Sequence, residues 1–321
     1  MRAAVLTTPG EPPGWAEHPD PRPAPGRSLV AVTAAPVVPL DLLCASGTSY
    51  FGTPATPYVP GVQGVGVVVD SAALAPGSRV WFATSAGMAP GDGSLAERTS
   101  VADGDLVPVP DGLADPVAAS FGLSAVAAWM ALTWRGRLQP GERVVVLGGG
   151  GAVGQVAVGA ARLLGAARVV AVSRPGASAD RARRAGADEV VELSPDADAL
   201  AAVLREACGG DVDVVVDPVF GTAATAASRV LASGGRLVNL GSAGGETAEF
   251  SSAVLRSRNA GVLGYTNNAL SPAQRAEALT TVFGHAAAGR LAVEHEVLPL
   301  PRVAEAWART AAGGTRQVLT A

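Results

Sequence analysis

The chain has 321 residues, of which 48% are hydrophobic and 16% are charged, with a formal net charge of −4 at pH 7. This length argues for about two domains, and the balance of apolar and charged residues is typical of a globular chain. No basic stripe with interleaved aromatic residues occurs, so we do not expect nucleic acid as a partner.

The basic and sulfur-containing residues exclude several chemistries. All 24 basic side chains are arginines, which rules out a Schiff base on lysine, a P-loop and a Tyr–Lys reductase pair. Cys44 and Cys208 lack CxxC spacing, which excludes a four-cysteine zinc site and fits a reducing compartment. Without a signal peptide or an apolar run of ~18 residues, we expect a cytoplasmic protein with no membrane span.

The first third of the chain has the texture of a compact β domain. Residues 1–115 are rich in Pro and Gly and contain short β-like runs at Leu29–Val32, Gly64–Val69 and Ser78–Phe82. From about Asp115 the texture changes, because PVAASFGLSAVAAWMALTWRG places apolar and small residues at helical spacing.

The middle of the chain alternates between buried strands and helices. Strands are predicted at 143–147, 168–172, 189–193, 212–216 and 236–240, and helices at 152–164, 178–185, 197–207 and 222–232. This order predicts an α/β fold in which helices cover both faces of a parallel sheet. A helix near 272–288 and β-like pieces at 292–298 and 316–320 then resemble the first segment in texture.

Four glycines follow the first of these strands in VVVLGGGGAVGQ. Read from Gly149, the loop satisfies G-x-G-x-x-G through Gly151 and Gly154, between a strand and a small-residue helix. Such a loop allows a tight turn, close approach of a pyrophosphate to the backbone, and close packing of the helix on the sheet. The helix N-terminus, which begins with Ala152 and Val153, favours an anion. We therefore predict a dinucleotide site rather than a flexible turn.

The end of the second strand indicates which dinucleotide binds. A site for NAD places Asp or Glu about 20 residues beyond the loop, to hold the ribose 2′-hydroxyl. Here that position is Ser173, 19 residues after Gly154, and Arg174 follows it. A hydroxyl and a guanidinium suit a 2′-phosphate, so the pattern favours NADPH, unless Arg174 is a solvated loop residue.

At this point the chain resembles the zinc-independent quinone oxidoreductase branch of the medium-chain dehydrogenase/reductase superfamily. The resemblance extends over nearly the whole chain, through MRAAVLTTPGEP, AAPVVPLDLLCASG, YVPGVQGVGVVV, LQPGERVVVLGGGGAVG, DVDVVVDPVFG, GGRLVNLGSAGG and RQVLTA. It implies a GroES-like β-barrel domain at 1–118, a Rossmann NADP-binding domain at 119–265 and a tail at 266–321 that returns to the first domain. A cleft between the domains would hold nicotinamide and substrate, and many members are homodimers.

The resemblance also implies site residues. Backbone contacts to the cofactor are expected around Gly241, Ser242 and Gly264, and Ser124 aligns with a Ser/Thr close to the cofactor. Ser173 and Arg174 match the segment that NADP-dependent relatives use for the 2′-phosphate. A lysine that many relatives carry in the next helix aligns with Ser178, which weakens that contact here.

Two departures from the family pattern concern the catalytic centre. Zinc-dependent relatives bind their catalytic metal through a Cys near Val38 and through His and Glu where this chain has Val62 and Gln63, and Cys44 lies six residues too late to substitute. We therefore expect no metal. Quinone reductases usually carry an Asn near the nicotinamide at the position of Val38, so the amide donor is missing as well.

Few polar side chains remain for the chemistry. Tyr50 is the candidate proton or hydrogen-bond donor, with packing in its own loop as the alternative; Val38, Leu43 and Tyr265 are candidate pocket residues, and Tyr265 equally suits a dimer seam. The sequence thus predicts an oxidoreductase that passes hydride from NADPH to a small molecule, either a quinone or an α,β-unsaturated carbonyl, including the enoyl substrates of secondary metabolism. An NADPH-binding protein of crystallin-like or regulatory role is the alternative, favoured by the missing amide.

Overall fold

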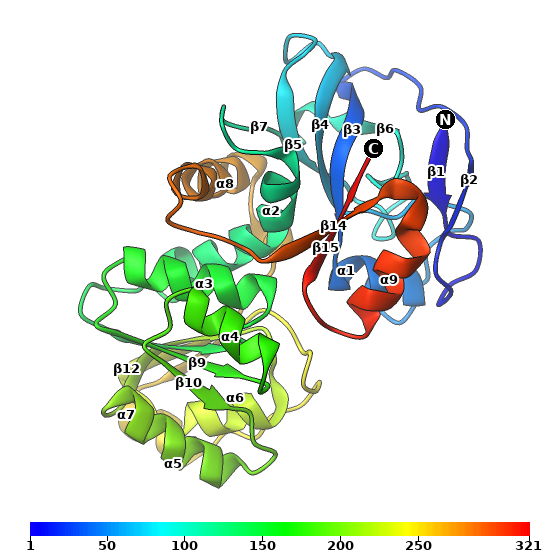
Figure 1. The fold of residues 1–321 in the computed structure, drawn as a ribbon. Helices are drawn as coiled ribbons and strands as arrows, with labels where there is room; N and C mark the ends of the chain where they lie inside the picture. The colour runs from blue at the N-terminus through cyan, green and yellow to red at the C-terminus, as the bar shows by residue number, and fades with distance from the viewer. The chain divides into compact units, whose positions relative to one another are not determined.

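The structure is a computed structural model that describes residues 1–321. The chain forms two compact units, coloured along the chain in Figure 1. The β unit comprises Met1–Leu123, Pro272–Ala287 and Val293–Ala321, and the α/β unit comprises Ser124–Ser271 and Ala288–Ala292. The C-terminal segment therefore packs with the N-terminal one.

The β unit is built on a seven-stranded sheet. Its strands are β3 (Arg27–Val37), β4 (Gln63–Asp70), β5 (Arg79–Ala83), β6 (Arg98–Ala102), β7 (Leu106–Pro108), β14 (His295–Pro299) and β15 (Arg316–Thr320). The order is β14-β15-β3-β4-β5-β7, with β6 paired to β3, and all pairs except β14–β15 are antiparallel. The three short strands predicted at the start of the chain lie in β3, β4 and β5.

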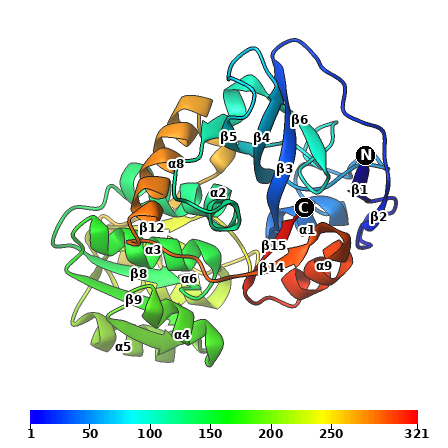
Figure 2. The same cartoon turned by 45° about the horizontal axis from the view of Figure 1, so that its top comes forward.

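Helices and a small second sheet complete this unit. A hairpin of β1 (Arg2–Val5) and β2 (Gly14–Glu17) lies beside α9 (Val303–Ala311), while α1 (Pro39–Ser46) packs on α9 and α8 (Pro272–Ala287) packs on β7. Figure 2 shows α9 next to β14 and β15. The sequence patterns predicted α8 but neither α1 nor α9.

The α/β unit confirms the predicted doubly wound parallel sheet. Its strands are β8 (Arg143–Leu147), β9 (Arg168–Ser173), β10 (Glu189–Glu192), β11 (Val212–Asp217), β12 (Leu231–Asn239) and β13 (Gly261–Gly264). All pairs are parallel in the order β10-β9-β8-β11-β12-β13, which is the 3-2-1-4-5-6 order of dinucleotide-binding sheets. The Val and Leu residues of β8 are fully buried, as strands covered on both faces require.

Five helices surround this sheet. They are α3 (Ala152–Leu163), α4 (Ala177–Arg184), α5 (Ala197–Cys208), α6 (Gly221–Ser228) and α7 (Ser252–Arg258). Helices α3 and α4 pack together, α3 on β8 and β9 and α4 on β9 and β10, and α5 and α6 pack together around a separate apolar cluster. The predicted helix 222–232 is too long, because Val230 and Leu231 are fully buried and the Val230 carbonyl accepts from the N–H of Val212.

Helix α2 (Asp115–Met130) continues into a π-helical turn at Ala131–Arg135. By length and composition alone this stretch is apolar enough to cross a membrane, and 61% of its most apolar window is buried inside the protein. A helix was expected here from the sequence, but only uninterrupted apolar runs were counted as membrane spans, so the absence of a membrane partner stays a prediction.

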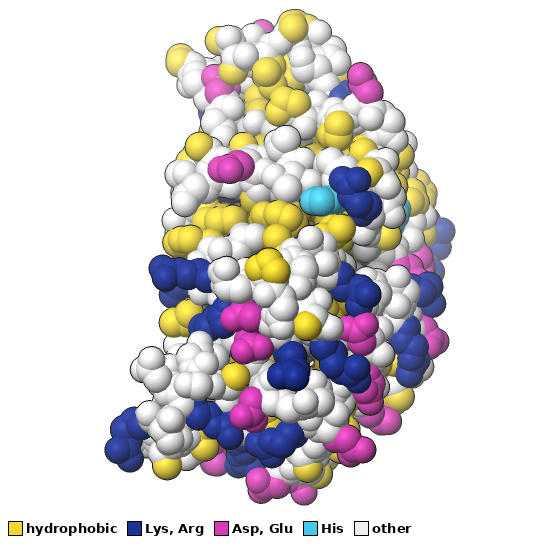
Figure 3. All heavy atoms as spheres, turned by 90° about the vertical axis from the view of Figure 1, so that its left-hand side faces the viewer, with side chains coloured by type: hydrophobic (Ala, Val, Ile, Leu, Met, Phe, Trp, Pro, Cys, Tyr) yellow, Lys and Arg dark blue, Asp and Glu magenta, His cyan; other side chains and the backbone are white.

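On the face drawn in Figure 3, arginines and acidic side chains are interspersed.

Candidate functional site

The glycine loop joins β8 to α3 with very little space around its backbone. Gly148 has a φ of +69°, in the left-handed region that favours glycine, and a Cβ atom on Gly154 would lie 2.2 Å from the Gly148 carbonyl oxygen. Gly151 is the N-cap of α3 and provides no side-chain cap. The first-turn N–H groups of α3, from Ala152 to Gly154, are therefore available to an anionic ligand.

Helix α4 lies directly against this loop. A Cβ atom on Gly150 would lie 2.1 Å from the Ser178 carbonyl oxygen, and the Nε of Arg181 donates a hydrogen bond to the Gly150 carbonyl oxygen over 2.8 Å. Arg181 is only 6% exposed, although it lies in a run of arginines that reads as a solvated surface. Sequence reasoning missed Arg181; its signal was the helical spacing from Ser178, which places both residues on the face that meets the loop.

The end of β9 carries the two residues predicted to select the cofactor. Ser173 is buried, and its Oγ lies 2.8 Å from the Oγ of Ser178 in the first turn of α4. Arg174 follows and is exposed. The position of the missing lysine therefore carries a hydroxyl that touches the predicted 2′-phosphate residue Ser173.

Further predicted cofactor residues follow the other strands of the sheet. Gly264 ends β13 and lies in register with Asn239 at the end of β12, and Gly241 and Ser242 follow two and three residues after Asn239. Because parallel strands end at the same edge, the structure brings these residues to the edge that carries the glycine loop, Ser173 and Arg174. Ligands of such sheets bind outside this edge.

Asp217, at the end of β11, organises the same edge and was not predicted. Its Oδ1 accepts hydrogen bonds from the N–H groups of Val219 and Phe220 over 2.9 and 2.7 Å, and Asn239 donates to its Oδ2. Asn239 also donates to the Gly241 carbonyl oxygen over 2.7 Å. Burial raises the pKa of Asp217, and these donors act in the opposite direction.

Tyr265 immediately follows β13. Its hydroxyl donates to Oδ1 of Asn267 over 2.6 Å, and its ring meets Trp134 edge to face with centroids 6.2 Å apart. Trp134 is 38% exposed, so this aromatic pair reaches the surface of the α/β unit. Tyr265 at this surface suits either a pocket wall or a contact with a second copy of the chain.

The positions that bind zinc in zinc-dependent relatives lie together in the β unit. Buried Asp41 accepts hydrogen bonds from the N–H of Val38 over 2.8 Å and from the N–H of Val62 over 2.9 Å. Burial raises the pKa of Asp41 to about 6, while the two N–H groups and Arg316 lower it. Cys44 is fully buried, and burial raises the pKa of its thiol to about 11, so the sulfur packs as a neutral group.

Gln63 is held at a break in α2. Gly122 has non-helical backbone angles of φ +41° and ψ −135°, and the next N–H, that of Leu123, donates to Oε1 of Gln63. Gln63 is completely buried, and its Nε2 has no hydrogen-bond partner. Ser124, a predicted cofactor contact, is half-buried and follows Leu123 directly.

The remaining predicted pocket residues are more exposed. Tyr50 is 80% exposed, and its ring lies 4.2 Å, centroid to centroid, from that of Phe51. Leu43, on α1, is 42% exposed. In this arrangement Tyr50 packs within its own loop, as the alternative interpretation expected, and its catalytic role stays a prediction.

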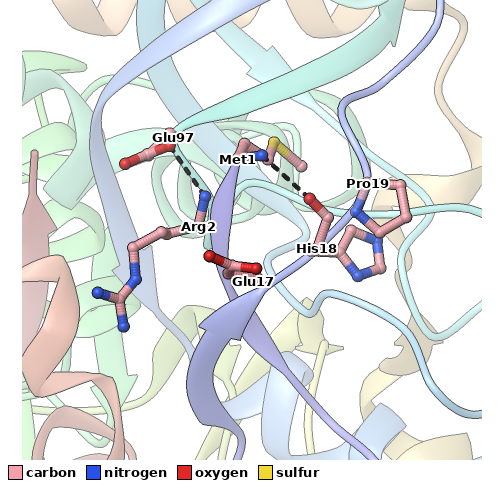
Figure 4. A pocket seen from close by; sticks show the side chains of 6 residues that line it. All are labelled: Met1, Arg2, Glu17, His18, Pro19 and Glu97. Carbon is pink, nitrogen blue, oxygen red and sulfur yellow. Dashed lines mark hydrogen bonds between the residues drawn. The ribbon is translucent and has the colours of Figure 1, made fainter.

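A polar hollow of about 590 Å³ lies elsewhere in the β unit, around the chain start (Figure 4). There the terminal amine of Met1 donates to the His18 carbonyl oxygen over 3.0 Å, and the Arg2 N–H donates to Oε2 of Glu97 over 2.9 Å. No predicted site residue lines this hollow.

Comparisons with known proteins agree with this architecture. Residues 24–111 match the alcohol dehydrogenase GroES-like domain, and residues 152–283 match the zinc-binding dehydrogenase family. Quinone oxidoreductase-like protein 2 of Bos taurus is 30% identical over 70% of this chain and 63% of that protein. The quinone oxidoreductase of Thermus thermophilus, also solved in complex with NADPH, superposes with a TM-score of 0.80 at 29% identity over all of both chains.

A different kind of relative matches more of the chain. One of the subunits of the phenolphthiocerol/phthiocerol polyketide synthase of Mycobacterium tuberculosis is 32% identical over 87% of this chain. The chain spans 12% of that protein's length.

Proposed function

Because the chain belongs to the quinone oxidoreductase branch of the medium-chain dehydrogenase/reductase superfamily, we propose that it is an NADPH-dependent, zinc-free oxidoreductase. Its acceptor in this proposal is a quinone or an α,β-unsaturated carbonyl compound. The observation that carries the proposal is the end of β9, where Ser173 and Arg174 stand beside the glycine loop in place of a carboxylate. A carboxylate there would repel a 2′-phosphate, whereas these side chains bind one.

The residues at the carboxyl edge of the sheet fit a dinucleotide phosphate. Side chains are absent where the backbone is most crowded, at Gly150 and Gly154, and no side chain caps the N-terminus of α3. The α3 N–H groups would receive the diphosphate, and the hydroxyls of Ser173 and Ser178 with the Arg174 guanidinium would receive the 2′-phosphate. Ser124, Gly241, Ser242 and Gly264 would border the nicotinamide half, as the family pattern implies.

Bound NADPH would supply a hydride from its nicotinamide ring. An α,β-unsaturated carbonyl takes the hydride at its β-carbon, the alkene electron pair moves toward the carbonyl oxygen, and a proton from solvent or from a side chain such as Tyr50 completes the reduction at the α-carbon. Negative charge therefore develops on the carbonyl oxygen, where a hydrogen-bond donor accelerates the reaction. The protein's tasks are to align the acceptor and to provide that donor.

The chemistry of the side chains supports a reaction without catalytic zinc. Val38 and Val62 have no ligating atoms, and Asp41 uses both carboxylate oxygens on the N–H groups of these same residues. Metal analysis of the purified protein tests this point, because stoichiometric zinc would overturn it. The polyketide synthase match supports testing enoyl acceptors of secondary metabolism beside quinones.

Turnover of NADPH and NADH with menadione, cinnamaldehyde and an enoyl thioester tests the activity. We expect acceptor-dependent oxidation of NADPH at a kcat/KM well above that for NADH. Tight NADPH binding without turnover of any acceptor would instead favour a cofactor-binding protein with a crystallin-like or regulatory role. The replacement of the family's Asn by Val38 supports this alternative.

We further propose a cytoplasmic homodimer. β13 forms an outer edge of the six-stranded sheet, so its free side could pair with a second copy. Light scattering coupled to gel filtration measures the mass in solution, and a monomer at micromolar concentration would contradict this assembly.

A further inference from the structure

We propose that the carboxamide of Gln63 donates a hydrogen bond from Nε2 to the carbonyl oxygen of the hydride acceptor. The inference rests on the proposed reductase function and assigns the donor that the chain lacks at Val38. It begins from an unusual group in the β unit: the Nε2 of Gln63 is a fully buried donor without a partner. Buried polar groups in native proteins are nearly always hydrogen-bonded, and an unpartnered donor beside candidate site residues is accounted for if a ligand supplies the missing partner.

The orientation of this carboxamide is fixed by its neighbour. The Leu123 N–H can only donate, so the atom that faces it must be the carbonyl oxygen of Gln63. The amide nitrogen therefore points away from Leu123. A flipped amide would set two donors against each other and leave the carbonyl oxygen unpaired.

The break in α2 serves this arrangement. At Gly122 the backbone leaves the helical region, and the N–H of the next residue, Leu123, donates to the Gln63 side chain. A Cβ atom on Gly122 would lie 2.1 Å from Oε1 and 2.7 Å from Nε2 of Gln63, so the whole carboxamide rests on the glycine. The carboxamide is thus held by the Leu123 N–H and by its contact with Gly122, as a donor needs to be before the reaction begins.

The place of Gln63 in the chain also suits an acceptor. It follows Val62, whose N–H is bound by Asp41 together with that of Val38, so it stands at the positions that hold catalytic metal in zinc-dependent relatives. On its other side, Leu123 directly precedes Ser124, a predicted cofactor contact. The amide would stabilise the negative charge that develops on the acceptor oxygen and would keep its own protons, because a carboxamide is too weak an acid to release one.

Two substitutions test the role of the amide. Gln63→Leu removes donor and acceptor, and Gln63→Glu keeps an oxygen toward Leu123 while replacing the NH₂ group by a second oxygen. With cinnamaldehyde and menadione, we expect kcat to fall by about 10²–10³-fold in both variants, the loss seen when one such donor is removed. The Kd of NADPH should stay within about twofold, since the amide serves the acceptor.

The pH dependence separates a donor from a structural group. The carboxyl group introduced by Gln63→Glu regains an O–H donor when it is protonated, so this variant should recover part of its activity as the pH is lowered, whereas Gln63→Leu should not. Thr99→Val is the matched control: Thr99 is also buried in the β unit with an unpartnered hydroxyl, and its removal should leave kcat unchanged.

The possible failures are distinguishable. If wild-type protein reduces these acceptors and Gln63→Leu does so equally well, the inference is wrong and the reductase function stands. A weaker NADPH Kd with unchanged kcat would assign the amide to the cofactor and also overturn it. If wild-type protein reduces neither acceptor, infrared difference spectra of cinnamaldehyde bound with NADP⁺ decide: a lowered carbonyl stretch that is lost in Gln63→Leu supports the hydrogen bond, and an unshifted stretch refutes it.

Discussion

Arg181 donates a hydrogen bond from its Nε to the carbonyl oxygen of Gly150 over 2.8 Å and thereby ties the second turn of α4 to the glycine loop. Gln155 donates to the same carbonyl oxygen over 3.2 Å. The Gly150 carbonyl oxygen of the loop is therefore hydrogen-bonded to two side chains of the protein. A loop held in this way loses less conformational freedom when a cofactor binds.

We predict that Arg181→Leu weakens NADPH binding by about tenfold, which corresponds to about 1.4 kcal/mol. The hydrogen bond to Gly150 and the buried cation would both be lost, so the loop would have to be ordered by the cofactor itself. Arg183→Leu is the control, because Arg183 lies on the exposed side of α4 and pairs with Asp180. Fluorescence titration of NADPH measures both variants, and equal affinities would contradict the role of Arg181.

A second prediction concerns cofactor choice. Arg174→Ala should raise the Kd of NADPH by about 10–100-fold, the range expected when a charged hydrogen bond of about 1.5–3 kcal/mol is lost. The Kd of NADH, which lacks the 2′-phosphate, should not change. Titration of both cofactors into wild type and variant tests this, and parallel weakening of both would show that Arg174 acts on the loop rather than on the phosphate.

The sequence predicted the α/β unit well because its signals are local. The signals are continuous Val runs, a glycine loop between strand and helix, and Ser173 at a strand end, and each one is read from a few consecutive residues. The end of α6 was missed because Val230 and Leu231 suit a helix and a strand equally. The hydrogen bond from the Val212 N–H to the Val230 carbonyl oxygen ties this segment to β11 and ends the helix, and the sequence pattern does not show that contact.

The site in the β unit was less predictable because its contacts are distant in sequence. Gln63 entered the sequence analysis only as a position where zinc-dependent relatives carry a metal ligand. Its contact with Leu123 joins residues 60 positions apart, and no local pattern reveals it. In the α/β unit, Arg181 was hidden among exposed arginines, because its spacing from Ser178 becomes informative only once the fold shows that Ser178 meets the glycine loop. Asp217 likewise looked like the end of a strand, with no sign that it binds the following turn.

The third prediction follows from the raised pKa of Asp41. Its pKa rises from 3.8 to about 6 on folding, so the folded state binds an additional proton between these pH values. The contribution of Asp41 to stability is therefore greatest below about pH 4 and falls as the pH rises through 6, by about 3 kcal/mol in all.

Urea unfolding of wild type and Asp41→Asn as a function of pH isolates this effect. The asparagine does not titrate and turns one donor toward Val38 or Val62, so it should be less stable than wild type in acid. The advantage of wild type should shrink as the pH is raised from 4 to 7. An advantage that grows with pH would mean that the N–H groups and Arg316 outweigh burial.

The last prediction tests the break in α2. Gly122→Ala places a methyl group 2.1 Å from Oε1 of Gln63 and forces alanine to φ +41° and ψ −135°, angles that side-chain-bearing residues rarely adopt. The backbone contributes about 1–3 kcal/mol of strain, and the overlap adds about 1–3 kcal/mol because Gln63 must leave Leu123. Gly112→Ala is the matched control, since Gly112 has a φ of +82° and a methyl group there would have no heavy atom within 4 Å. Urea unfolding should show a clearly larger loss of stability at Gly122, and equal losses would mean that Gln63 gives way freely and is not held by the helix break.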